Sequence, residues 1–450
     1  MARPKNELAG KRVVVMGLGH FGGGAGAARY LAQQGAQVLV TDSAPAERLR
    51  ASVAKLADLP IEYRFGRHEL RDFTDADLIV VNPAIDPTRN RFLNAATAAN
   101  IAQTSEIRLL VERLPNRMRT IGVTGTAGKS TVTAMIGHIL KQVYKPKNPK
   151  SSGVWIGGNL GGSLLEKLDQ IKSDDWVVLE LSSFMLQGLA EHRWSPHVAV
   201  ITNFSPNHLD WHGTLEAYRR AKQVILDYQE PHCDVAILGA GTQAEFHSKV
   251  RITRTESVTN PLASKLSLSL PGEHNRANGL VAADAVASGL GVDWTSAAAA
   301  LSKFCGLPHR LEFICQRSGV RYYNDSKATT PEAAQQSIGS FASDQVHAIL
   351  GGYDKRAELH PLATFAAHHC RAIYTIGATG DAIADAATGH SAELIRCGSL
   401  GQAVAETNRR VQAGDIVLLS PACASWDQFA NFEVRGEHFA KLVRERQTSH

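Results

Sequence analysis

The chain has 450 residues, of which 44% are hydrophobic and 20% are charged, and its formal net charge at pH 7 is +5. This length allows about three domains, and the small net charge does not favour a polyanionic partner such as nucleic acid. No apolar run approaches the roughly 18 residues of a membrane span, the N-terminus lacks the apolar core of a signal peptide, and the six cysteines show no C-x-x-C spacing. We therefore expect a reduced, cytoplasmic enzyme without membrane insertion.

Residues 11–42 predict a nucleotide-binding βαβ unit. Residues 11–16 are typical of a buried strand, residues 17–22 have the pattern G-x-G-x-x-G, and a helix is expected to about residue 34. The second strand ends on Asp42, about 20 residues beyond the third glycine. This is the fingerprint of a dinucleotide site, and it suits another nucleotide diphosphate equally well because it recognises only the pyrophosphate and a ribose hydroxyl. Further glycines at positions 23, 24 and 26 indicate a very close backbone approach.

A further strand is expected at residues 78–83, and the first domain is expected to end near residue 115.

Residues 120–131 then predict a phosphate-binding loop. An apolar strand, residues 120–123, leads into a glycine-rich turn that ends in Gly-Lys-Ser-Thr, and a helix is expected over residues 133–142. Glycines allow backbone N–H groups to approach phosphate oxygens at the helix start. The motif departs from the general pattern in having Val123 at the position of its first glycine.

The candidate nucleotide-binding residues of this loop are Gly125, Thr126, Gly128, Lys129, Ser130 and Thr131. Lys129 is expected to reach the terminal phosphates, and the Ser130 hydroxyl is expected to reach Mg²⁺. The alternative is an ordinary glycine-rich turn. The basic segment that follows, residues 141–150, contains two prolines and a single aromatic residue, and we interpret it as a solvated loop rather than a nucleic-acid surface.

Two buried strands are predicted after this loop, at residues 176–181 and 198–203. The first contains Glu180 near its carboxyl end, where an acid is well placed to hold Mg²⁺; the alternative is a buried acid paired with a structural base. His208 and His212 have the i,i+4 spacing of a zinc pair, but no third ligand follows at a suitable distance. Lys222, considered by itself, has the pattern of an exposed helix lysine.

Residues 265–270 alternate like a strand, and residues 272–275 (Gly-Glu-His-Asn) open an alanine-rich helix that is expected to end near residue 288. The plain interpretation of Asn275 is a helix cap. Residues 307–312 indicate a hinge into a third unit, in which strands are expected at residues 320–324, 346–350, 372–376 and 415–420. Polar clusters follow three of these strands, at residues 324–329, 351–355 and 420–425. Because ligands bind at the carboxyl ends of parallel strands, we expect the three clusters to face one cleft.

Taken together, these motifs resemble the Mur ligase family over nearly the whole chain, and within it the member that adds D-glutamate. The resemblance is carried by residues 122–131, 179–184, 272–275, 307–310, 324–329 and 420–425. It implies an α/β fold of three domains: a Rossmann-like domain that binds a UDP-sugar, a central P-loop ATPase-like parallel sheet, and a Rossmann-like domain that binds the amino acid. The expected boundaries are residues 1–115, 116–308 and 309–450.

The resemblance also implies an activity. ATP would phosphorylate the terminal carboxylate of UDP-N-acetylmuramoyl-L-alanine, and the amine of D-glutamate would attack the acyl phosphate to give an amide, ADP and phosphate. Two Mg²⁺ ions are implied, and the enzyme is expected to be a monomer. The implied catalytic residues are Lys129, Asn159, Glu180, His208 and Lys222, and the implied metal ligands are Ser130, Glu180, His208 and a carbamylated Lys222.

The remaining implied contacts divide by ligand. Asn275, Arg310 and Asp325 would bind ATP together with the phosphate-binding loop. Gly17, Gly19, His20, Gly22, Asp42 and Ser43 would bind the UDP-sugar, and Lys327, Thr329, Lys355, Ser425 and Phe432 would fix D-glutamate. Four features depart from the family pattern: Thr330 in place of asparagine, the form of residues 351–355, the glycine run at 22–26, and an insertion at 144–152 that could alter loop closure or a partner contact.

Three alternatives remain open. The first is another amide ligase of the same fold with a different amino acid or acceptor, such as a sibling Mur ligase or a folylpolyglutamate synthase. The second is an NAD-dependent dehydrogenase, based on the glycine motif and Asp42. The third is a nucleotide-dependent regulatory module. The dehydrogenase hypothesis leaves Lys129, Glu180 and His208 without a shared task.

Overall fold

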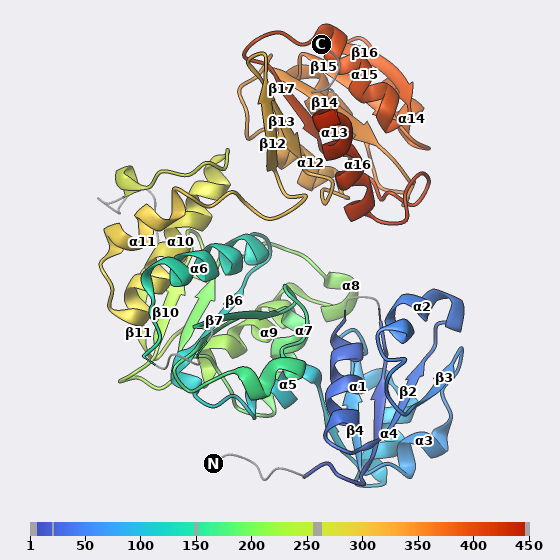
Figure 1. The fold of residues 1–450 in the computed structure, drawn as a ribbon, viewed down its shortest axis with the longest axis vertical. Helices are drawn as coiled ribbons and strands as arrows, with labels where there is room; N and C mark the ends of the chain where they lie inside the picture. The colour runs from blue at the N-terminus through green and yellow to red at the C-terminus, as the bar shows by residue number, and fades with distance from the viewer. Residues whose placement is uncertain (1–6, 20–21, 148–150, 152, 255–262, 446–450) are drawn as a thin grey trace. The chain divides into compact units, whose positions relative to one another are not determined.

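The computed structural model describes residues 7–19, 22–147, 151, 153–254 and 263–445. By compactness the chain divides into two units (Figure 1). Unit 1 comprises Met1–Leu266 and Ala277–Leu301, and unit 2 comprises Ser267–Arg276 and Ser302–His450. The described residues form three sheets, two in unit 1 and one in unit 2.

The first sheet has the strand order β3-β2-β1-β4-β5, and every pairing in it is parallel. Val13, Val14 and Val15 of the central strand are at most 1% exposed, as expected where helices cover both faces of a parallel sheet. The elements are β1 (Arg12–Met16), α1 (Gly23–Gln33), β2 (Gln37–Asp42), α2 (Ala46–Ala54), β3 (Ile61–Phe65), α3 (Leu70–Thr74), β4 (Leu78–Val81), α4 (Arg91–Ala98), β5 (Ala102–Thr104) and α5 (Glu106–Val111).

The second sheet has the order β11-β10-β9-β6-β8-β7 and is also parallel throughout. The carboxyl ends of all six strands therefore lie at the same edge of the sheet, and ligands bind at this edge in such sheets. The elements are β6 (Thr120–Thr124), α6 (Lys129–Val143), β7 (Val154–Gly158), β8 (Trp176–Glu180), α7 (Ser183–Ala190), β9 (Val198–Ile201), α8 (Leu209–His212), α9 (Leu215–Asp227), β10 (Val235–Leu238), β11 (Arg251–Arg254), α10 (Glu273–Leu290) and α11 (Trp294–Leu301).

The sheet of unit 2 has the order β12-β13-β17-β14-β15-β16. It is parallel except for β12, an edge strand that runs antiparallel to β13. The elements are β12 (Glu312–Arg317), β13 (Val320–Asn324), α12 (Pro331–Ile338), β14 (Val346–Gly351), α13 (His360–His369), β15 (Ala372–Ile376), α14 (Gly380–Ala387), β16 (Glu393–Gly398), α15 (Leu400–Arg410), β17 (Ile416–Leu419) and α16 (Phe432–Glu445). The three sheets agree with the three-domain α/β architecture expected from the sequence.

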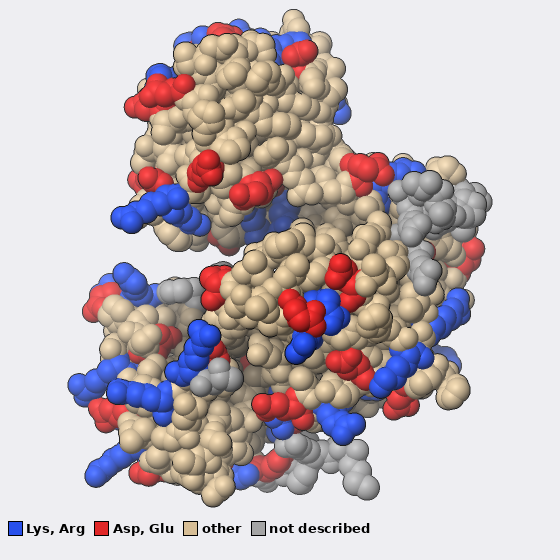
Figure 2. Space-filling view, turned by 180° about the vertical axis from the view of Figure 1, so that it is seen from behind, with Lys and Arg blue, Asp and Glu red and all other residues tan. Residues whose placement is uncertain are grey.

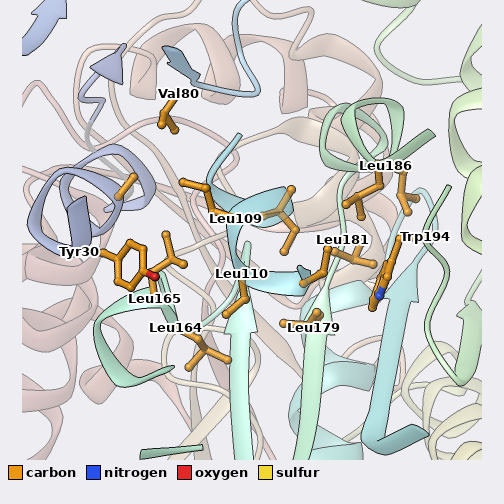
Figure 3. Close-up of a cluster of buried hydrophobic side chains, with 14 of the residues drawn as sticks. Tyr30, Val80, Leu109, Leu110, Leu164, Leu165, Leu179, Leu181, Leu186 and Trp194 are labelled. Carbon is orange, nitrogen blue, oxygen red and sulfur yellow. The ribbon is translucent and has the colours of Figure 1, made fainter. Parts of the chain in front are cut away.

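One hydrophobic cluster in unit 1 includes residues that flank both of its sheets. Figure 3 shows Leu109 and Leu110 of α5 between Tyr30 of α1 and Leu179 of β8, all with their side chains in this cluster. Apolar burial of this kind is the main favourable contribution to folding. The predicted boundary at residue 115 therefore lies inside a compact unit rather than at an open linker.

The surface has a mixed charge. Figure 2 shows acidic and basic side chains side by side across the face that it presents, in keeping with the small net charge of +5. Among the described helices, none has both the length and the hydropathy that a membrane crossing requires.

Three sequence-based expectations about elements need correction. The strand predicted at residues 265–270 is wrong: Ala263–Lys265 is a 3-10 turn, and residues 266–270 form no strand. Buried Leu266 and Leu270 produced the alternating pattern although the segment pairs with no sheet. The helix after the phosphate-binding loop begins at Lys129 rather than residue 133, because Gly128 supplies the left-handed turn that starts it. Asn275 lies inside α10, two residues after its first residue Glu273.

Candidate functional site at the strand ends

The phosphate-binding loop joins β6 to α6. Its backbone requires glycine at two positions, since Gly125 has φ 149° and Gly128 has φ 77°. A Cβ at position 128 would lie 2.5 Å from Oδ1 of Asn278, so a side chain would not fit there either. Lys129 is the first residue of α6, so the N–H groups of the loop lie at the positive end of the helix dipole. Ser130, the next residue, is 8% exposed.

Two residues at the end of β9 hold this loop. The Asn203 side chain accepts a hydrogen bond from Ala127 N at 2.8 Å and donates one to Ala127 O at 3.1 Å. Thr202 Oγ1 also donates to Ala127 O, at 2.6 Å. The main chain adds a bond from Thr126 N to Asn203 O at 3.1 Å. The loop is therefore held at the backbone N–H and C=O of Ala127 and at the N–H of Thr126.

Two lysine amines converge on one carbonyl oxygen of this loop. Lys129 Nζ donates to Gly125 O at 3.0 Å, and Lys222 Nζ donates to the same atom at 2.8 Å. Lys222, from α9, is 1% exposed, so the interpretation of it as an exposed helix lysine is wrong. Burial, together with the charge of Lys129, lowers the pKa of Lys222 to about 6. The ring centroid of Tyr218 lies 4.6 Å from Lys222 Nζ, and Tyr218 OH is 3.3 Å from Thr126 Oγ1.

Glu180 ends β8 beside the phosphate-binding loop, since Val123 of β6 is its register partner. It is 1% exposed. One carboxylate oxygen, Oε1, accepts from Asn159 Nδ2 at 3.1 Å, while Oε2 is buried without a hydrogen-bond partner. Asn159 is held in turn by a bond from its N–H to Glu180 O at 2.9 Å. A buried carboxylate oxygen with no donor suits a cation, and carboxylate, amide and hydroxyl oxygens are ligands that Mg²⁺ accepts.

The described residues contain no group of three or more His, Cys, Asp or Glu side chains arranged to hold a metal. A cation beside Glu180 would therefore draw on the Ser130 hydroxyl, on phosphate oxygens and on water, which is the usual environment of nucleotide-bound Mg²⁺. The residues present thus fit the metal that the resemblance implies.

His208 lies in the exposed segment that precedes α8 and has φ 53°. Partial desolvation and the positive charges of Lys129 and Lys222 lower its pKa, which places it in the same electrostatic neighbourhood as the two amines. His212, one helical turn later, is held differently: its ring stacks on Phe184 with centroids 5.4 Å apart, and Nε2 lies 3.0 Å from Ser183 Oγ.

The glycine motif at the end of β1 is organised by Asp42. Asp42 Oδ2 accepts from Leu18 N at 2.8 Å and from Gly19 N at 3.3 Å, while Oδ1 accepts from Ala44 N at 2.8 Å. The predicted close approach occurs at Gly24, where a Cβ would lie 2.5 Å from Leu18 O, and at Gly26, where it would lie 2.4 Å from Ser163 Cβ. Left-handed φ values occur at Gly17, Gly19 and Gly22, Ser43 is exposed, and His20 lies outside the described residues.

The three polar clusters of unit 2 meet, as the crevice argument predicts. Ser420 Oγ donates to Asp325 Oδ2 at 2.8 Å, which joins the first cluster to the third. Tyr353 N donates to Ala424 O at 2.9 Å, which joins the second cluster to the third. Burial raises the pKa of Asp325 to about 6, although Ser337, Ser420 and Leu311 N donate hydrogen bonds to it.

The predicted amino-acid contacts lie around these joined clusters. Lys327 Nζ is 5.0 Å from the ring centroid of Phe432. Lys355 Nζ is 5.0 Å from that of Trp426, an exposed aromatic residue that sequence reasoning missed. Ser425 is 2% exposed, and Thr329 is half-buried. Thr330, where the family pattern has asparagine, caps α12 by accepting from Ala333 N.

Arg310 and Asn275, the other predicted ATP contacts, both belong to unit 2. The positive charge of Arg310 lowers the pKa of Asp325 against the larger effect of burial. Asn275 Nδ2 donates to Pro271 O at 2.7 Å, and its side chain therefore stabilises the turn before α10.

The segment after α6 lies far from the reacting groups of its own sheet. Tyr144 OH donates to Asp174 O at 2.6 Å, and Lys147 N donates to Asp174 Oδ2 at 2.6 Å. Asp174 precedes β8, so these contacts are at the amino edge of the sheet, opposite the phosphate-binding loop. Residues 148–150 and 152 of the 144–152 insertion lie outside the described residues, so its expected effect on loop closure or a partner contact stays a prediction.

Comparison with known proteins agrees with this arrangement. Three family models match the chain: a Mur ligase MurD-like N-terminal domain over residues 11–104, the Mur ligase middle domain over residues 123–286, and the Mur ligase glutamate ligase domain over residues 309–423. The matched regions correspond to the three sheets and include all of the loops described above except the last residues of the third cluster.

Relatives named UDP-N-acetylmuramoylalanine–D-glutamate ligase match over nearly the full length. The protein of Roseiflexus sp. is 37% identical, with 97% of this chain and 99% of the relative covered. That of Acidobacterium capsulatum is 35% identical, with 97% of each covered. Among solved structures, a UDP-N-acetylmuramate–alanine ligase from Thermotoga maritima shares the fold with a TM-score of 0.59 at 20% identity, covering 97% of this chain and 100% of the other. A MurF ligase from the same organism, in complex with ADP, has a TM-score of 0.57 at 16% identity and covers 98% and 99%.

Proposed function

The chain belongs to the Mur ligase family, and we infer that it joins D-glutamate to UDP-N-acetylmuramoyl-L-alanine with the conversion of ATP to ADP and phosphate. It is an ATP-dependent acid–amino-acid ligase of peptidoglycan precursor synthesis. The observation that carries the D-glutamate assignment is the match, over 97% of the chain, to relatives that bear this activity in their names. The joined loops of unit 2 support it, because they carry lysines and hydroxyls, which can bind the carboxylates of a dicarboxylic amino acid.

The reaction needs an activated carboxylate. The carboxylate of the nucleotide substrate attacks the γ-phosphorus of ATP, the bond to the β-γ bridging oxygen breaks, and ADP leaves. The amine of D-glutamate then attacks the acyl phosphate carbonyl, and the tetrahedral intermediate collapses with loss of phosphate and of one amine proton. In both steps positioning and electrostatics supply most of the rate.

We assign the phosphate-handling residues as follows. The loop N–H groups and the dipole of α6 bind the phosphates, and Lys129 moves from the loop carbonyls to neutralise the transferring group. Ser130, Glu180, His208 and a carbamylated Lys222 would hold two Mg²⁺ ions, which polarise the phosphoryl oxygens. Asn159 fixes the orientation of Glu180 through the 3.1 Å hydrogen bond to Oε1.

The environment of Lys222 supports the proposed carbamylation. An amine with its pKa lowered to about 6 is largely uncharged at neutral pH. It can add to CO₂ with formation of an N–C bond and release of a proton, which gives a carboxylate-like oxygen ligand. The 1% exposure of Lys222 shields that group from competing reactions.

The other assignments divide between the units. Gly17, Gly19, His20, Gly22, Asp42 and Ser43 would contact the UDP-sugar. Asn275, Arg310 and Asp325 would bind ATP, and Lys327, Thr329, Lys355, Ser425 and Phe432 would fix D-glutamate. We propose three domains with boundaries near residues 115 and 308, a monomeric state and a cytoplasmic location, where ATP and nucleotide sugars are both available.

Phosphate release with ATP, Mg²⁺ and UDP-N-acetylmuramoyl-L-alanine, with each amino acid added separately, tests this function. We expect release that depends on D-glutamate, together with a matching mass gain on the nucleotide. Release with another amino acid would retain the family and remove the assignment of unit 2. Absence of release with every amino acid, despite ATP binding, would overturn the proposed acceptor.

A further inference from the structure

Arg435 is the largest charged side chain among the fully buried residues that the structure describes, at 1% exposure. It lies in the first turn of α16. Burial lowers its pKa to about 10, so the guanidinium is charged at neutral pH. No motif identified in the sequence includes it, and the mechanism above does not use it.

The acceptors of this buried cation are neutral oxygens. Nε donates to Ser326 Oγ at 2.9 Å and Nη2 donates to Ser326 O at 2.9 Å. Nη1 donates to Cys423 O at 3.1 Å and to Ala424 O at 3.2 Å. Charge-assisted hydrogen bonds of this kind offset the cost of removing the ion from water.

These acceptors lie on two of the three polar clusters of unit 2. Ser326 belongs to residues 324–329, and Cys423 and Ala424 belong to residues 420–425. The remaining cluster, residues 351–355, packs against the same group, because a Cβ at Gly352 would lie 3.2 Å from Arg435 Nη1 and 2.3 Å from Ala424 O. Ser326 Oγ in turn donates to Phe432 O at 2.8 Å, which fixes the start of α16 to the first cluster.

The geometry requires the fork of an arginine. Its N–H groups lie in one plane and point in fixed, divergent directions, and here they reach both turns at once. A lysine presents three donors from a single atom and would satisfy one turn while leaving carbonyls of the other buried without a donor.

We propose that Arg435 is the positioning residue that sets the spacing of the loops carrying the amino-acid contacts Lys327, Thr329, Lys355 and Ser425. The identity of the ligand, D-glutamate, rests on the proposed function, whereas the role of Arg435 in spacing the loops does not. Because the contacts are on separate loops, their relative placement depends on the group that links them, and small misplacements of binding groups strongly reduce turnover.

The first test is steady-state kinetics of Arg435→Lys in the full chain. We expect the KM for D-glutamate to rise about 10- to 100-fold, while the KM for UDP-N-acetylmuramoyl-L-alanine stays within about twofold, since its contacts are on unit 1. A merely structural loss would reduce the active fraction, and hence kcat, with both KM values unchanged; that result would overturn the proposal. Arg317→Lys is the matched control, because Arg317 Nη1 also bonds a carbonyl of α16, Val443 O, at 2.6 Å but touches none of the three clusters through that bond.

The second test needs no substrate. We expect amide hydrogen exchange at residues 324–329 and 420–425 to become about tenfold faster in Arg435→Lys, with exchange in β14 and β15 unchanged. Equal exchange in the variant and the wild type would overturn the positioning role even if D-glutamate proved not to be the substrate. If the variant does not fold, Ser326→Ala removes one acceptor and the link to Phe432 O, and it should shift the same KM and the same amides in the same direction by a smaller factor; no shift would contradict the proposal.

Discussion

At the scale of single residues, the chemistry of the site depends on what surrounds each charged group. Lys129 and Lys222 share one acceptor, Gly125 O, yet only Lys222 is fully buried. Burial disfavours the charge of Lys222, and in our proposal this amine reacts with CO₂ while Lys129 binds the phosphates. Two residues of the same type would thus have different roles.

Lys222→Ala should reduce kcat more than about 100-fold, the scale of losing one electrostatic group in an active site. Short carboxylic acids such as acetate should restore part of this loss, because they supply the missing oxygen ligand. Steady-state phosphate release with and without added acid measures both effects. Arg220→Ala is the control, since that side chain is on the same helix and 74% exposed, and it should retain normal activity. Normal activity of the Lys222 variant would remove the carbamate assignment.

Glu106 predicts a pH dependence of stability. It is buried at the start of α5 with Ser163 Oγ 2.5 Å from its carboxylate, and burial raises its pKa from 4.5 to about 7. Between these two pH values the folded state holds a proton on Glu106 that the unfolded state has lost. The contribution of Glu106 to the free energy of unfolding therefore falls as pH rises from about 4.5 to 7 and is constant above pH 7. The full difference is on the order of 3 kcal/mol.

Glu106→Gln should therefore flatten this part of the profile and make the protein more stable than the wild type at pH 8, as measured by urea unfolding at pH 5 and pH 8. Glu62→Gln, at a side chain that is 69% exposed, should leave the profile unchanged. If the stability of Glu106→Gln fell more steeply with pH than that of the wild type, the Glu106 carboxylate would be ionised in the folded wild-type protein, and the prediction would be wrong.

The sequence was informative at some of these residues and not at others. Lys129 and Glu180 were predictable because their positions follow from local patterns: a glycine turn before a helix, and the end of an apolar strand. Lys222 and Arg435 were not, because their burial depends on which distant segments pack over them. A lysine one turn from arginines on a helix has the same local pattern whether it faces solvent or a loop carbonyl.

At the scale of elements, the end of β9 acts as a brace for the phosphate-binding loop. Asn203 and Thr202 make three side-chain hydrogen bonds to the backbone N–H and C=O of Ala127. Glycine loops lack side-chain packing of their own, so their conformation depends on such external contacts. The next residues along the chain lead to His208, and the brace therefore connects the phosphate-binding loop to the segment that carries a proposed metal ligand.

Asn203→Ala should raise the KM for ATP about tenfold or more, on the scale of one to two buried hydrogen bonds, with little change in the KM for D-glutamate. Initial rates at varied ATP measure this. Asn90→Ala is the matched control, because Asn90 also accepts from two backbone N–H groups, those of Phe92 and Leu93, at the start of α4. Asn90→Ala should lower thermal stability and leave the KM for ATP unchanged. Equal effects of both variants on that KM would contradict the role of Asn203 in holding the phosphate-binding loop.

Most long apolar strands and the helix after the phosphate-binding loop were predictable from the sequence, since buried parallel strands have continuous apolar runs. The edge strands β3, β5, β11, β12 and β16 did not stand out, because they carry polar and charged residues. The edge strand β7 has only three apolar residues before two glycines. The segment at 265–270 shows the opposite error. Its alternation arises from two buried leucines in an irregular turn, which no period-two pattern distinguishes from a strand.

At the scale of the whole molecule, the proposed ATP contacts are divided between the units. The phosphate-binding loop is in unit 1, while Asn275, Arg310 and Asp325 are in unit 2. A ligand that contacts both units favours the arrangement in which both sets of contacts form, and this shifts the population toward that state.

Small-angle scattering should therefore show a smaller radius of gyration when a non-hydrolysable ATP analogue and UDP-N-acetylmuramoyl-L-alanine are added together. The nucleotide sugar alone, whose proposed contacts are in unit 1, serves as the control and should produce a smaller change. An unchanged curve with both ligands present would mean that the units do not close on substrate.

The division of the chain into units also has a consequence for its synthesis. Unit 1 is discontinuous: residues 267–276 belong to unit 2, and the chain then returns through Ala277–Leu301 before entering unit 2 for the rest of its length. A growing chain therefore contains every residue of unit 1 only when residue 301 has left the ribosome. By then ten residues of unit 2, Ser267–Arg276, have emerged ahead of all their partners. Domains fold from the N-terminus during translation, so we expect unit 1 to fold first. The segment Ser267–Arg276, which includes the first turn of α10, then waits for the last third of the chain.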